Sequence, residues 1–404
     1  MSTQATVPVV VVGAGPVGLC TALCLARHGV ATVLLERERQ LPGDLRASTF
    51  HPPTLEMLED LGLTGAMLEG GLRVPTWQVR QHETHERAVF DLGVLAADTR
   101  HPYRLQFEQA AFCQLALDAV RAEPRIRLSF GAEVKGLVRL DDAVSLNVAH
   151  PGGRDPLRAR YVVAADGASS TLRRLLALPF EGLTYPETTV LATTTFPFEN
   201  HLPGLSPVNY VWIGDSNYAL LRLPDCWRVS LYPDPDEDPQ AEPWRMDDPE
   251  RIEAKLQRIV PQTGRYTVIE HRPYRVHQRI VPTYHSGRVL LAGDAAHVNS
   301  PSGGMGMNCG IHDAFSLAEK LAGVLAGGSE DLLALYDRQR RPVAADEILR
   351  QADRNRNRMR NTDPAWRRAE LARLQAIAAD PAAAREHLLA SSMITGLRRA
   401  AAIQ

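Results

Sequence analysis

The sequence lacks the features that mark membrane-spanning and nucleic-acid-binding proteins. No uninterrupted apolar stretch approaches the ~18 residues of a membrane span, and no basic segment precedes the first valine run. The formal net charge of the 404 residues is only -2, so no overall field favours nucleic acid or an anionic membrane surface as a partner. We therefore expect a cytoplasmic protein that binds small molecules.

Cysteine is scarce, and its spacing argues against two kinds of site. The five cysteines include no CxxC pair and no spacing typical of metal ligands. Cys20 and Cys24 lie four residues apart on a predicted helix, which favours buried packing over a redox pair. The sequence thus predicts no metal site and no structural disulfide.

Residues 7–36 have the pattern of a strand, a glycine turn, a helix and a second strand. The apolar runs Val9–Val12 and Thr32–Leu35 suit parallel strands that are covered on both faces. This unit is therefore a predicted βαβ unit.

The turn of this unit carries a dinucleotide-binding pattern. Gly13, Gly15 and Gly18 form GxGxxG, and Glu36 ends the second strand. These glycines allow a tight turn and close approach of a pyrophosphate, whose charge the N-terminus of the helix would face. Glu36 would accept hydrogen bonds from ribose hydroxyls. At this point the cofactor is NAD or FAD.

Two further stretches carry the resemblance that chooses between them. Asp166 and Arg173 belong to DGASSTLR, and residues 293–308 read GDAAHVNSPSGGMGMN; each stretch follows an apolar run. With GxGxxG, in this order and spacing, they resemble the flavoprotein monooxygenases of the para-hydroxybenzoate hydroxylase family. The resemblance covers roughly 7–345 and is weakest between 181 and 270. Tyr336–Pro342 is similar to the family's ending of its flavin domain.

The resemblance implies an α/β fold with a Rossmann-like FAD-binding domain of the glutathione-reductase type, a strand-rich substrate domain and a helical C-terminal segment. Turn signals and alternating patterns in the middle of the chain, followed by helical patterns at its end, agree with this arrangement. We expect the following bounds: 1–75, 101–180 and 283–345 for the discontinuous FAD-binding domain, 76–100 and 181–282 for the substrate domain, and 346–404 for the C-terminal segment.

The resemblance also implies the residues that hold FAD. Asp294 would bond the ribityl chain, the glycine loop would lie against the isoalloxazine ring, and the helix from about Met305 would point its positive end at the pyrimidine edge. Arg46 is alternatively a surface residue, Gln106 a polar residue at a helix start and Val134 a core residue. Asp166 and Arg173 would help to shape the nicotinamide and pyrophosphate region, with a structural cap as their alternative role. The implied set is Gly13, Gly15, Pro16, Val17, Gly18, Glu36, Arg37, Arg46, Gln106, Val134, Asp166, Asp294, Pro301, Gly304, Met305, Gly306, Met307 and Asn308.

The activity implied by the resemblance is that of an FAD-dependent, NAD(P)H-using monooxygenase. A flavin C4a-hydroperoxide, formed with dioxygen, would hydroxylate a small aromatic, heteroaromatic or aromatic natural-product substrate. The alternatives are a reductase or dehydrogenase on the same scaffold, a halogenase, whose WxWxIP signature is absent, and a non-catalytic flavin-binding regulator. NADH and NADPH both stay open, as do a monomer and a homodimer.

The substrate side of the site is less defined by the sequence. Pro301 and Arg46 are the expected catalytic positions, and Tyr210, Trp212, Tyr218 and Arg222 are the expected substrate contacts, each with sheet packing or surface exposure as its alternative. His297 more plausibly braces its loop than transfers protons, and no catalytic base is assigned. Arginines spaced two apart in 350–361 spread around a predicted helix, which favours a solvated face or an interface. The tail from Pro381 is expected to pack as an amphipathic helix on the body or on a partner subunit.

Overall fold

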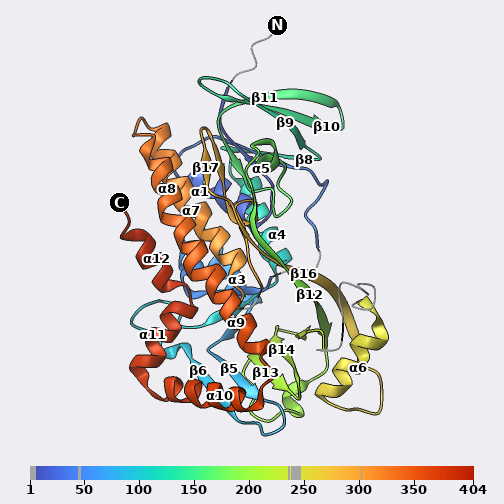
Figure 1. Cartoon of the computed structure of the whole chain (residues 1–404). Coiled ribbons are helices and arrows are strands. Elements are labelled where there is room, and N and C mark those ends of the chain that lie inside the picture. Colours follow the sequence, from blue (N-terminus) through green and yellow to red (C-terminus); the bar gives the residue numbers. More distant parts are fainter. Residues whose placement is uncertain (1–5, 44–46, 235–236, 238–246, 302) are drawn as a thin grey trace.

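A computed structural model describes residues 6–43, 47–234, 237, 247–301 and 303–404 (Figure 1). The chain forms two large mixed sheets, a small sheet of three strands, and a run of helices at its C-terminal end. Within the described residues, no helix combines the length and the apolar character needed to cross a membrane.

The first sheet holds the predicted βαβ unit. Five of its strands run parallel in the order β18-β11-β1-β2-β8, and Val9–Val12 of β1 are buried, as expected for a sheet covered on both faces. Antiparallel strands extend it at one edge and beside β11. The strands are β1 (Val7–Val12), β2 (Thr32–Glu36), β8 (Ile126–Phe130), β9 (Glu133–Arg139), β10 (Val144–His150), β11 (Gly153–Ala164), β17 (His285–Ser286) and β18 (Val289–Leu291).

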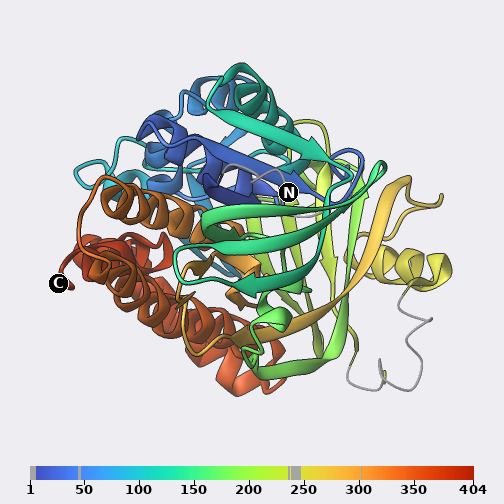
Figure 2. The same ribbon diagram turned by 90° about the horizontal axis from the view of Figure 1, so that it is seen from above.

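Helices far apart in the sequence pack together beside this sheet. Helix α1 contacts both α4 and α7, and α7 contacts α8; in Figure 2 the orange helices α7 and α8 lie beside the blue N-terminal elements. The predicted helix over 305–326 is α7. The helices are α1 (Pro16–Arg27), α2 (Pro52–Glu59), α3 (Thr64–Gly70), α4 (Gln109–Ala122), α5 (Thr171–Leu175), α7 (Gly306–Leu325) and α8 (Asp331–Val343).

Two smaller sets of elements link this unit to the rest of the chain. The small sheet has the order β3-β7-β4, with bounds Thr49–Phe50, Arg104–Gln106 and Leu72–Val74. Short 3-10 helices are η1 (Leu92–Leu95), η2 (Phe198–Asn200) and η4 (Gly293–Ala295). Strand β7 places residues of the first unit next to the second sheet.

The second sheet has the order β19-β16-β12-β15-β14-β13-β5-β6. Its long strands β12 and β16 extend from the first unit to the lower half of the molecule, as Figure 1 shows. Helix α6 (Pro249–Ile259) packs against one face through Ile252 and Leu256. The strands are β5 (Thr76–Gln81), β6 (Arg87–Asp91), β12 (Glu181–Thr194), β13 (Val208–Ile213), β14 (Ser216–Arg222), β15 (Trp227–Leu231), β16 (Val268–Ile280) and β19 (His297–Val298).

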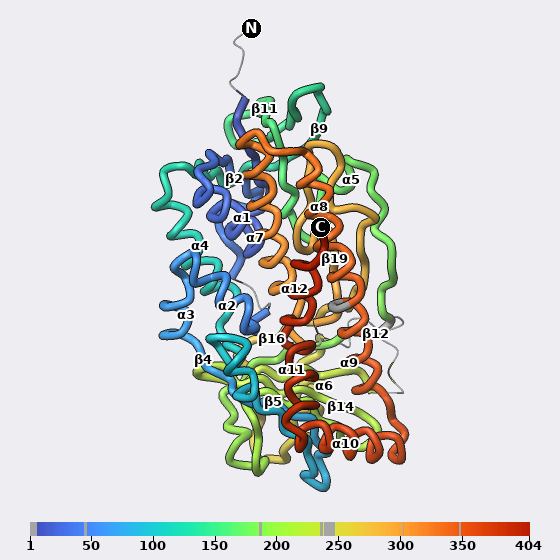
Figure 3. Tube along the Cα trace, turned by 90° about the vertical axis from the view of Figure 1, so that its left-hand side faces the viewer, coloured from blue at the N-terminus to red at the C-terminus, as the bar shows by residue number. Residues whose placement is uncertain are grey.

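The C-terminal helices cover the other face of this sheet. Leu371, Leu374, Leu388 and Leu389 join a core with Trp77 and Phe90 of β5 and β6, so the alanine-rich tail packs on the body of the same chain. In Figure 3 these helices run from α10 at the bottom back up to α12, which contacts α8. The bounds are η5 (Ala344–Leu349, a π-helix), α9 (Arg350–Arg360), α10 (Pro364–Ala379), α11 (Pro381–Ser391) and α12 (Ile394–Ala401).

Candidate active site

The first glycine turn is shaped by the packing of the chain on one side and is open on the other. A Cβ at Gly13, where φ is +103°, would lie 2.3 Å from the carbonyl oxygen of Ala165, and one at Gly18 would lie 1.8 Å from that of Gly13. A Cβ at Gly15 would meet nothing within 4 Å, and no side chain caps the N-terminus of α1, which begins at Pro16. The turn therefore fits an anionic group held by backbone N–H groups.

The acid at the end of β2 lies beside this turn. Glu36 accepts hydrogen bonds from the backbone N–H groups of Ala14 (2.7 Å) and Glu38 (2.9 Å), which fixes its carboxylate at the glycine turn. Arg37 is exposed and pairs with Glu38 at 3.2 Å. Val134 is buried in β9 opposite Val148, so only its backbone is available to a ligand.

The motif DGASSTLR (166–173) and the stretch 293–308 are connected by a hydrogen bond. Asp166 accepts hydrogen bonds from Ser170 Oγ (2.5 Å) and the backbone N–H of Thr171 (2.7 Å), and so caps α5. Arg173 is buried and donates to the carbonyl oxygen of Ala295 at 3.0 Å. Asp294 is the one exposed residue between Val289 and Val298, so its carboxylate faces outward from a buried turn.

The glycine loop before α7 is locked to the small sheet. Gly304 has φ +66°, and a Cβ there would lie 2.8 Å from Cβ of Thr49. Asn308 is fully buried; its Oδ1 accepts from the backbone N–H of His51 (2.9 Å) and its Nδ2 donates to the carbonyl oxygens of Thr49 (2.8 Å) and Gly304 (2.7 Å). Gln106 Oε1 accepts from the Thr49 hydroxyl at 3.1 Å. These bonds hold the loop in one conformation.

The start of α7 is a second uncapped helix end. Met305 precedes the helix and is buried, Gly306 begins it, and Met307 is half-buried in its first turn; no side chain caps this end. Pro301 is exposed, and its carbonyl oxygen accepts from the N–H of Gly304 at 2.9 Å. Because no described side chain caps this end, its N–H groups suit a ligand that carries negative charge.

His51 lies under the glycine loop as a neutral imidazole. Its Nε2 is 2.9 Å from the carbonyl oxygen of Gly303, and its buried Nδ1 has no hydrogen-bond partner in the part of the chain that the structure describes. Burial, and then the positive charge of Arg104, lower the pKa of His51 to about 3. The ring therefore donates to the loop without carrying a charge.

A buried cluster of charges braces the turn from behind. Asp313 of α7 accepts from Arg340 Nε and from His297 Nε2, each at 2.8 Å, and from the N–H of Gly293 at 3.1 Å. Burial alone would raise the pKa of Asp313, but Arg340 and His297 outweigh it and lower that pKa. This arrangement gives His297 the bracing position that the sequence favours.

The same cluster has the donor set of a metal site. Ligand atoms of His297, Cys309 and Asp313 lie within 4.8 Å of one another. Arg340, however, donates to Asp313 and lies 3.4 Å from Cys309 Sγ. The guanidinium thus supplies the positive charge that a metal ion would bring.

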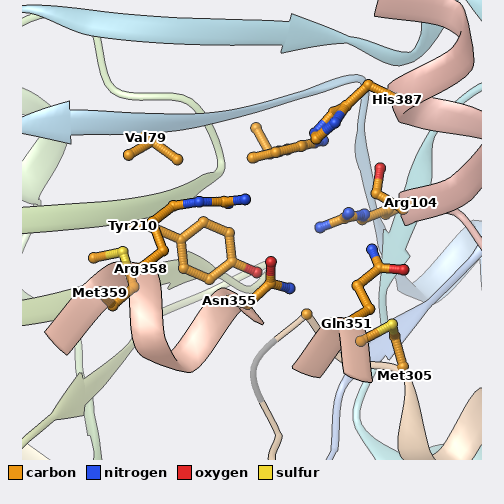
Figure 4. A pocket seen from close by; sticks show the side chains of 12 residues that line it. Val79, Arg104, Tyr210, Met305, Gln351, Asn355, Arg358, Met359 and His387 are labelled. Atoms are coloured by element: carbon orange, nitrogen blue, oxygen red, sulfur yellow. The ribbon is translucent and has the colours of Figure 1, made fainter. Parts of the chain in front are cut away.

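A cavity lies where the glycine loop meets the second sheet and the C-terminal helices (Figure 4). Its walls come from β5, β7, β13, the loop before α7, α9 and α11. The lining residues are Trp77, Val79, Arg104, Tyr210, Gly303, Met305, Gln351, Asn355, Arg358, Met359, His387 and Ser391. Since Gly303 and Met305 belong to the loop that the resemblance places on a flavin ring, the cavity and the expected cofactor site share a wall.

Comparison with known protein families decides the identity of this arrangement. Residues 6–351 match the family described as FAD binding domain. The chain belongs to this family. The glycine turn, Glu36 and the end of α7 that begins at Gly306 stay the expected FAD site, and the open side of Gly15 leaves room there for a cofactor.

Relatives of this FAD-binding family member are aromatic hydroxylases. The para-nitrophenol 4-monooxygenase of Pseudomonas sp. strain WBC-3 is 34% identical over 393 residues, 96% of each chain. The 6-hydroxy-3-succinoylpyridine 3-monooxygenase of Pseudomonas putida strain S16 is 31% identical, over 88% of this chain and 90% of the relative. The crystal structure of a p-nitrophenol 4-monooxygenase from Pseudomonas putida DLL-E4 superimposes with a TM-score of 0.89 at 35% identity, over 98% of this chain and 99% of that one.

These comparisons confirm the predicted family, the α/β fold class and the enzyme class. The chain is an FAD-dependent aromatic monooxygenase, a class A flavoprotein, and the alternative of a reductase without oxygen insertion is not favoured.

The predicted substrate residues lie in different places in this flavoprotein. Tyr210 lines the cavity. Trp212 is on the same face of β13 but is fully buried under the C-terminal helices, where its Nε1 donates to the carbonyl oxygen of Arg358 at 3.2 Å. Tyr218 and Arg222 of β14 belong to the opposite face, beside the α6 core and Trp227. Because side chains alternate along a strand, Tyr218 and Arg222 point away from the cavity. Of the four predicted residues, Tyr210 lines it. Arg46 lies outside the described residues.

Several cavity residues escaped the sequence reasoning. Arg104 lies two positions before Gln106 on β7, and the period of two places both side chains on one side of the strand. The prediction of Gln106 could therefore have indicated Arg104 as well. Trp77 and Val79 have the same spacing on β5. Residues of α9 and α11 had no such signal, because nothing in their local pattern indicates that helices so late in the chain pack over β13.

Proposed function

We propose that this flavoprotein hydroxylates a small ring that carries a hydroxyl group, a phenol or a hydroxypyridine. NADH or NADPH serves as the reductant and dioxygen as the source of the inserted oxygen. The names of the related enzymes, a para-nitrophenol 4-monooxygenase and a 6-hydroxy-3-succinoylpyridine 3-monooxygenase, support this substrate class.

One observation carries the proposal. Gly303 and Met305 line the cavity and also belong to the loop and helix end that would hold the flavin ring. A ring bound between Trp77, Tyr210 and Met305 therefore lies next to the cofactor. The burial of this space by α9 and α11 keeps water away from the reacting atoms.

The chain's own residues divide the work. The glycine turn and Glu36 would hold the adenosine and pyrophosphate end of FAD, Asp294 would hold the ribityl chain, and the N–H groups at Gly306 and Met307 would face the pyrimidine edge. Bound FAD supplies the redox chemistry, taking reducing equivalents from the nicotinamide and activating dioxygen. Pro301 stays a proposed wall of the reaction space.

The test is substrate-dependent oxidation of NAD(P)H by the purified, FAD-loaded protein. We expect phenols or hydroxypyridines to stimulate oxidation, and expect one atom of ¹⁸O₂ to appear in the product by mass spectrometry. Stimulated oxidation without label in any product would contradict oxygen insertion, and only a reduced product would indicate a reductase. The matched control is the same reaction without the aromatic compound, in which NAD(P)H oxidation stays slow.

A further inference from the structure

Arg104 is a buried cation that faces the cavity without a carboxylate partner. Arg104 is only 3% exposed, and within the described part of the chain no acidic group forms an ion pair with it. Among the described residues its Nε has no hydrogen-bond partner, while its guanidinium forms a hydrogen bond with Tyr210 and lies over the face of Trp77, whose ring centroid is 5.4 Å away. A desolvated charge in this state is costly unless something compensates it.

The other arginine in the cavity is compensated. Arg358 projects toward the same space as Arg104 in Figure 4, but its Nε donates to Glu370 at 2.9 Å, outside the cavity lining. Among the described residues that line the cavity there is no aspartate or glutamate. The lining therefore carries an excess of positive charge, and Arg104 is its source.

The rest of the lining is suited to an aromatic ring. Trp77 stacks on Phe90 with centroids 4.4 Å apart and is held edge-on to Tyr210 at 6.0 Å, so its position is fixed by neighbouring rings. Met305 and Met359 add apolar, polarisable surface. His387 is uncharged near neutral pH, because burial and then Arg358 lower its pKa to about 4, and its buried Nε2 has no partner.

We propose that Arg104 is the anion-binding, specificity-determining residue of this site, and that the substrate binds as an aromatic ring with a negatively charged oxygen. That oxygen is either an ionised ring hydroxyl or a carboxylate substituent, and it takes the donor positions of Arg104 that no protein carboxylate fills. The inference rests on the proposed function in one respect, that this cavity receives the aromatic substrate.

The first experiment measures binding without turnover. The oxidised, FAD-loaded full-length protein is titrated, with no nicotinamide present, and flavin absorbance reports the Kd. The probes are 4-nitrophenol at a pH where it is ionised, 4-hydroxybenzoate, and neutral 4-methylphenol. We expect one of the two anions to bind at least about tenfold more tightly than the neutral ring, since a hydrogen bond to a charged group is worth that much. Which anion does so separates a hydroxyl from a carboxylate source.

The variants assign the preference to one residue. R104Q should weaken binding of the preferred anion by about 10- to 100-fold and change that of 4-methylphenol by less than about threefold. R104K, which keeps the charge and loses the planar fork, should keep part of the preference. The matched control is R80Q: Arg80 is 1% exposed on β5 but is outside the cavity lining and donates to the carbonyl oxygen of Pro203. Its preference should equal that of the wild type.

The outcomes separate this inference from the proposed function. Equal binding of anions and neutral ring by the wild type, or an unchanged preference in folded R104Q, would overturn the inference even if hydroxylation is observed. Conversely, an anion preference that depends on Arg104 supports it even if no oxygen is inserted into any probe. If R104Q does not fold, R104K and the wild-type comparison still decide the matter.

Discussion

Two buried arginines show how the flavin-binding unit and the cavity differ. Arg340 is 1% exposed and Arg104 is 3% exposed. Arg340 Nε donates to Asp313 at 2.8 Å. Asp313 also accepts from the backbone N–H of Gly293, in the turn that is expected to face the flavin. Arg104 instead has the phenol group of Tyr210 and the indole face of Trp77 as its neighbours. The charges of the first region are balanced by the chain itself, whereas the charge of the second is left for a ligand.

This difference relates to what each region does. A cofactor that stays bound needs a scaffold whose conformation is fixed in advance, and buried charges that balance one another provide it. A substrate enters and leaves, so a site can keep one unbalanced group that gains a partner only when the right compound is present. Removing a charge should therefore have opposite consequences for stability in the two regions.

The largest effect is expected from Asp313→Ala. This change leaves Arg340 buried without its counter-charge and frees the N–H of Gly293, so the free energy of unfolding should fall by about 3–5 kcal/mol. Bound flavin should be lost together with the brace. Chemical denaturation and the flavin-to-protein absorbance ratio measure both. The control is Asp142→Ala, which breaks an exposed pair with Arg158 and should cost less than about 1 kcal/mol; an equal loss in both variants would contradict the comparison.

The glycine turn offers a matched pair within the first region. Gly13→Ala places a Cβ against the Ala165 backbone at a φ of +103°, so we expect a loss of about 3 kcal/mol or more in the free energy of unfolding. Gly15→Ala meets no protein atom, so the fold should be almost unchanged while the affinity for FAD drops. Thermal unfolding of the FAD-free proteins, followed by FAD titration, checks this. Full FAD affinity in Gly15→Ala would show that the cofactor does not approach that side.

Acid should weaken the contact between the two regions through His51. Its pKa is about 3 in the folded protein against an ordinary 6.5, so below pH 6.5 the unfolded chain takes up a proton that the folded chain refuses. Stability therefore falls as the pH falls through this window, by roughly 2–3 kcal/mol between pH 6.5 and 4.5 for this one residue. In His51→Gln, the slope of unfolding free energy against pH should be shallower than in the wild type. Identical slopes would contradict the assignment.

The sequence predicts the residues of the flavin-binding unit better than those of the cavity, and the reason is physical. At Gly13 and Gly18 the backbone, and at Gly304 the side chain of Thr49, leaves no room for a Cβ, so a local pattern predicts the site and the resemblance extends it to Asp294 and Asn308. The cavity has no such requirement. It is assembled from β7, β5, β13 and two late helices, and its members are fixed only when tertiary packing is known.

Tyr210 and Trp212 illustrate the limit. Both are aromatic residues on one face of β13, yet only Tyr210 lines the cavity, because α9 and α10 cover Trp212 through Arg358 and Trp366. Strand periodicity indicates which face a side chain belongs to. It does not indicate which part of that face a later helix will cover.

The smallest effect is expected from Arg104→Met, and its sign is the sharpest test of the comparison. Because no carboxylate in the described chain pairs with Arg104, replacing it by an apolar side chain of similar length removes a desolvation cost without leaving a buried anion behind. The free energy of unfolding, measured without aromatic ligand, should stay unchanged or rise by about 1 kcal/mol. Arg340→Met is the matched control and should destabilise by several kcal/mol, since it removes the guanidinium that pairs with the buried Asp313. A comparable loss of stability in both variants would mean that Arg104 is already balanced inside the protein, and the cavity would then have no unmet charge with which to select an anion.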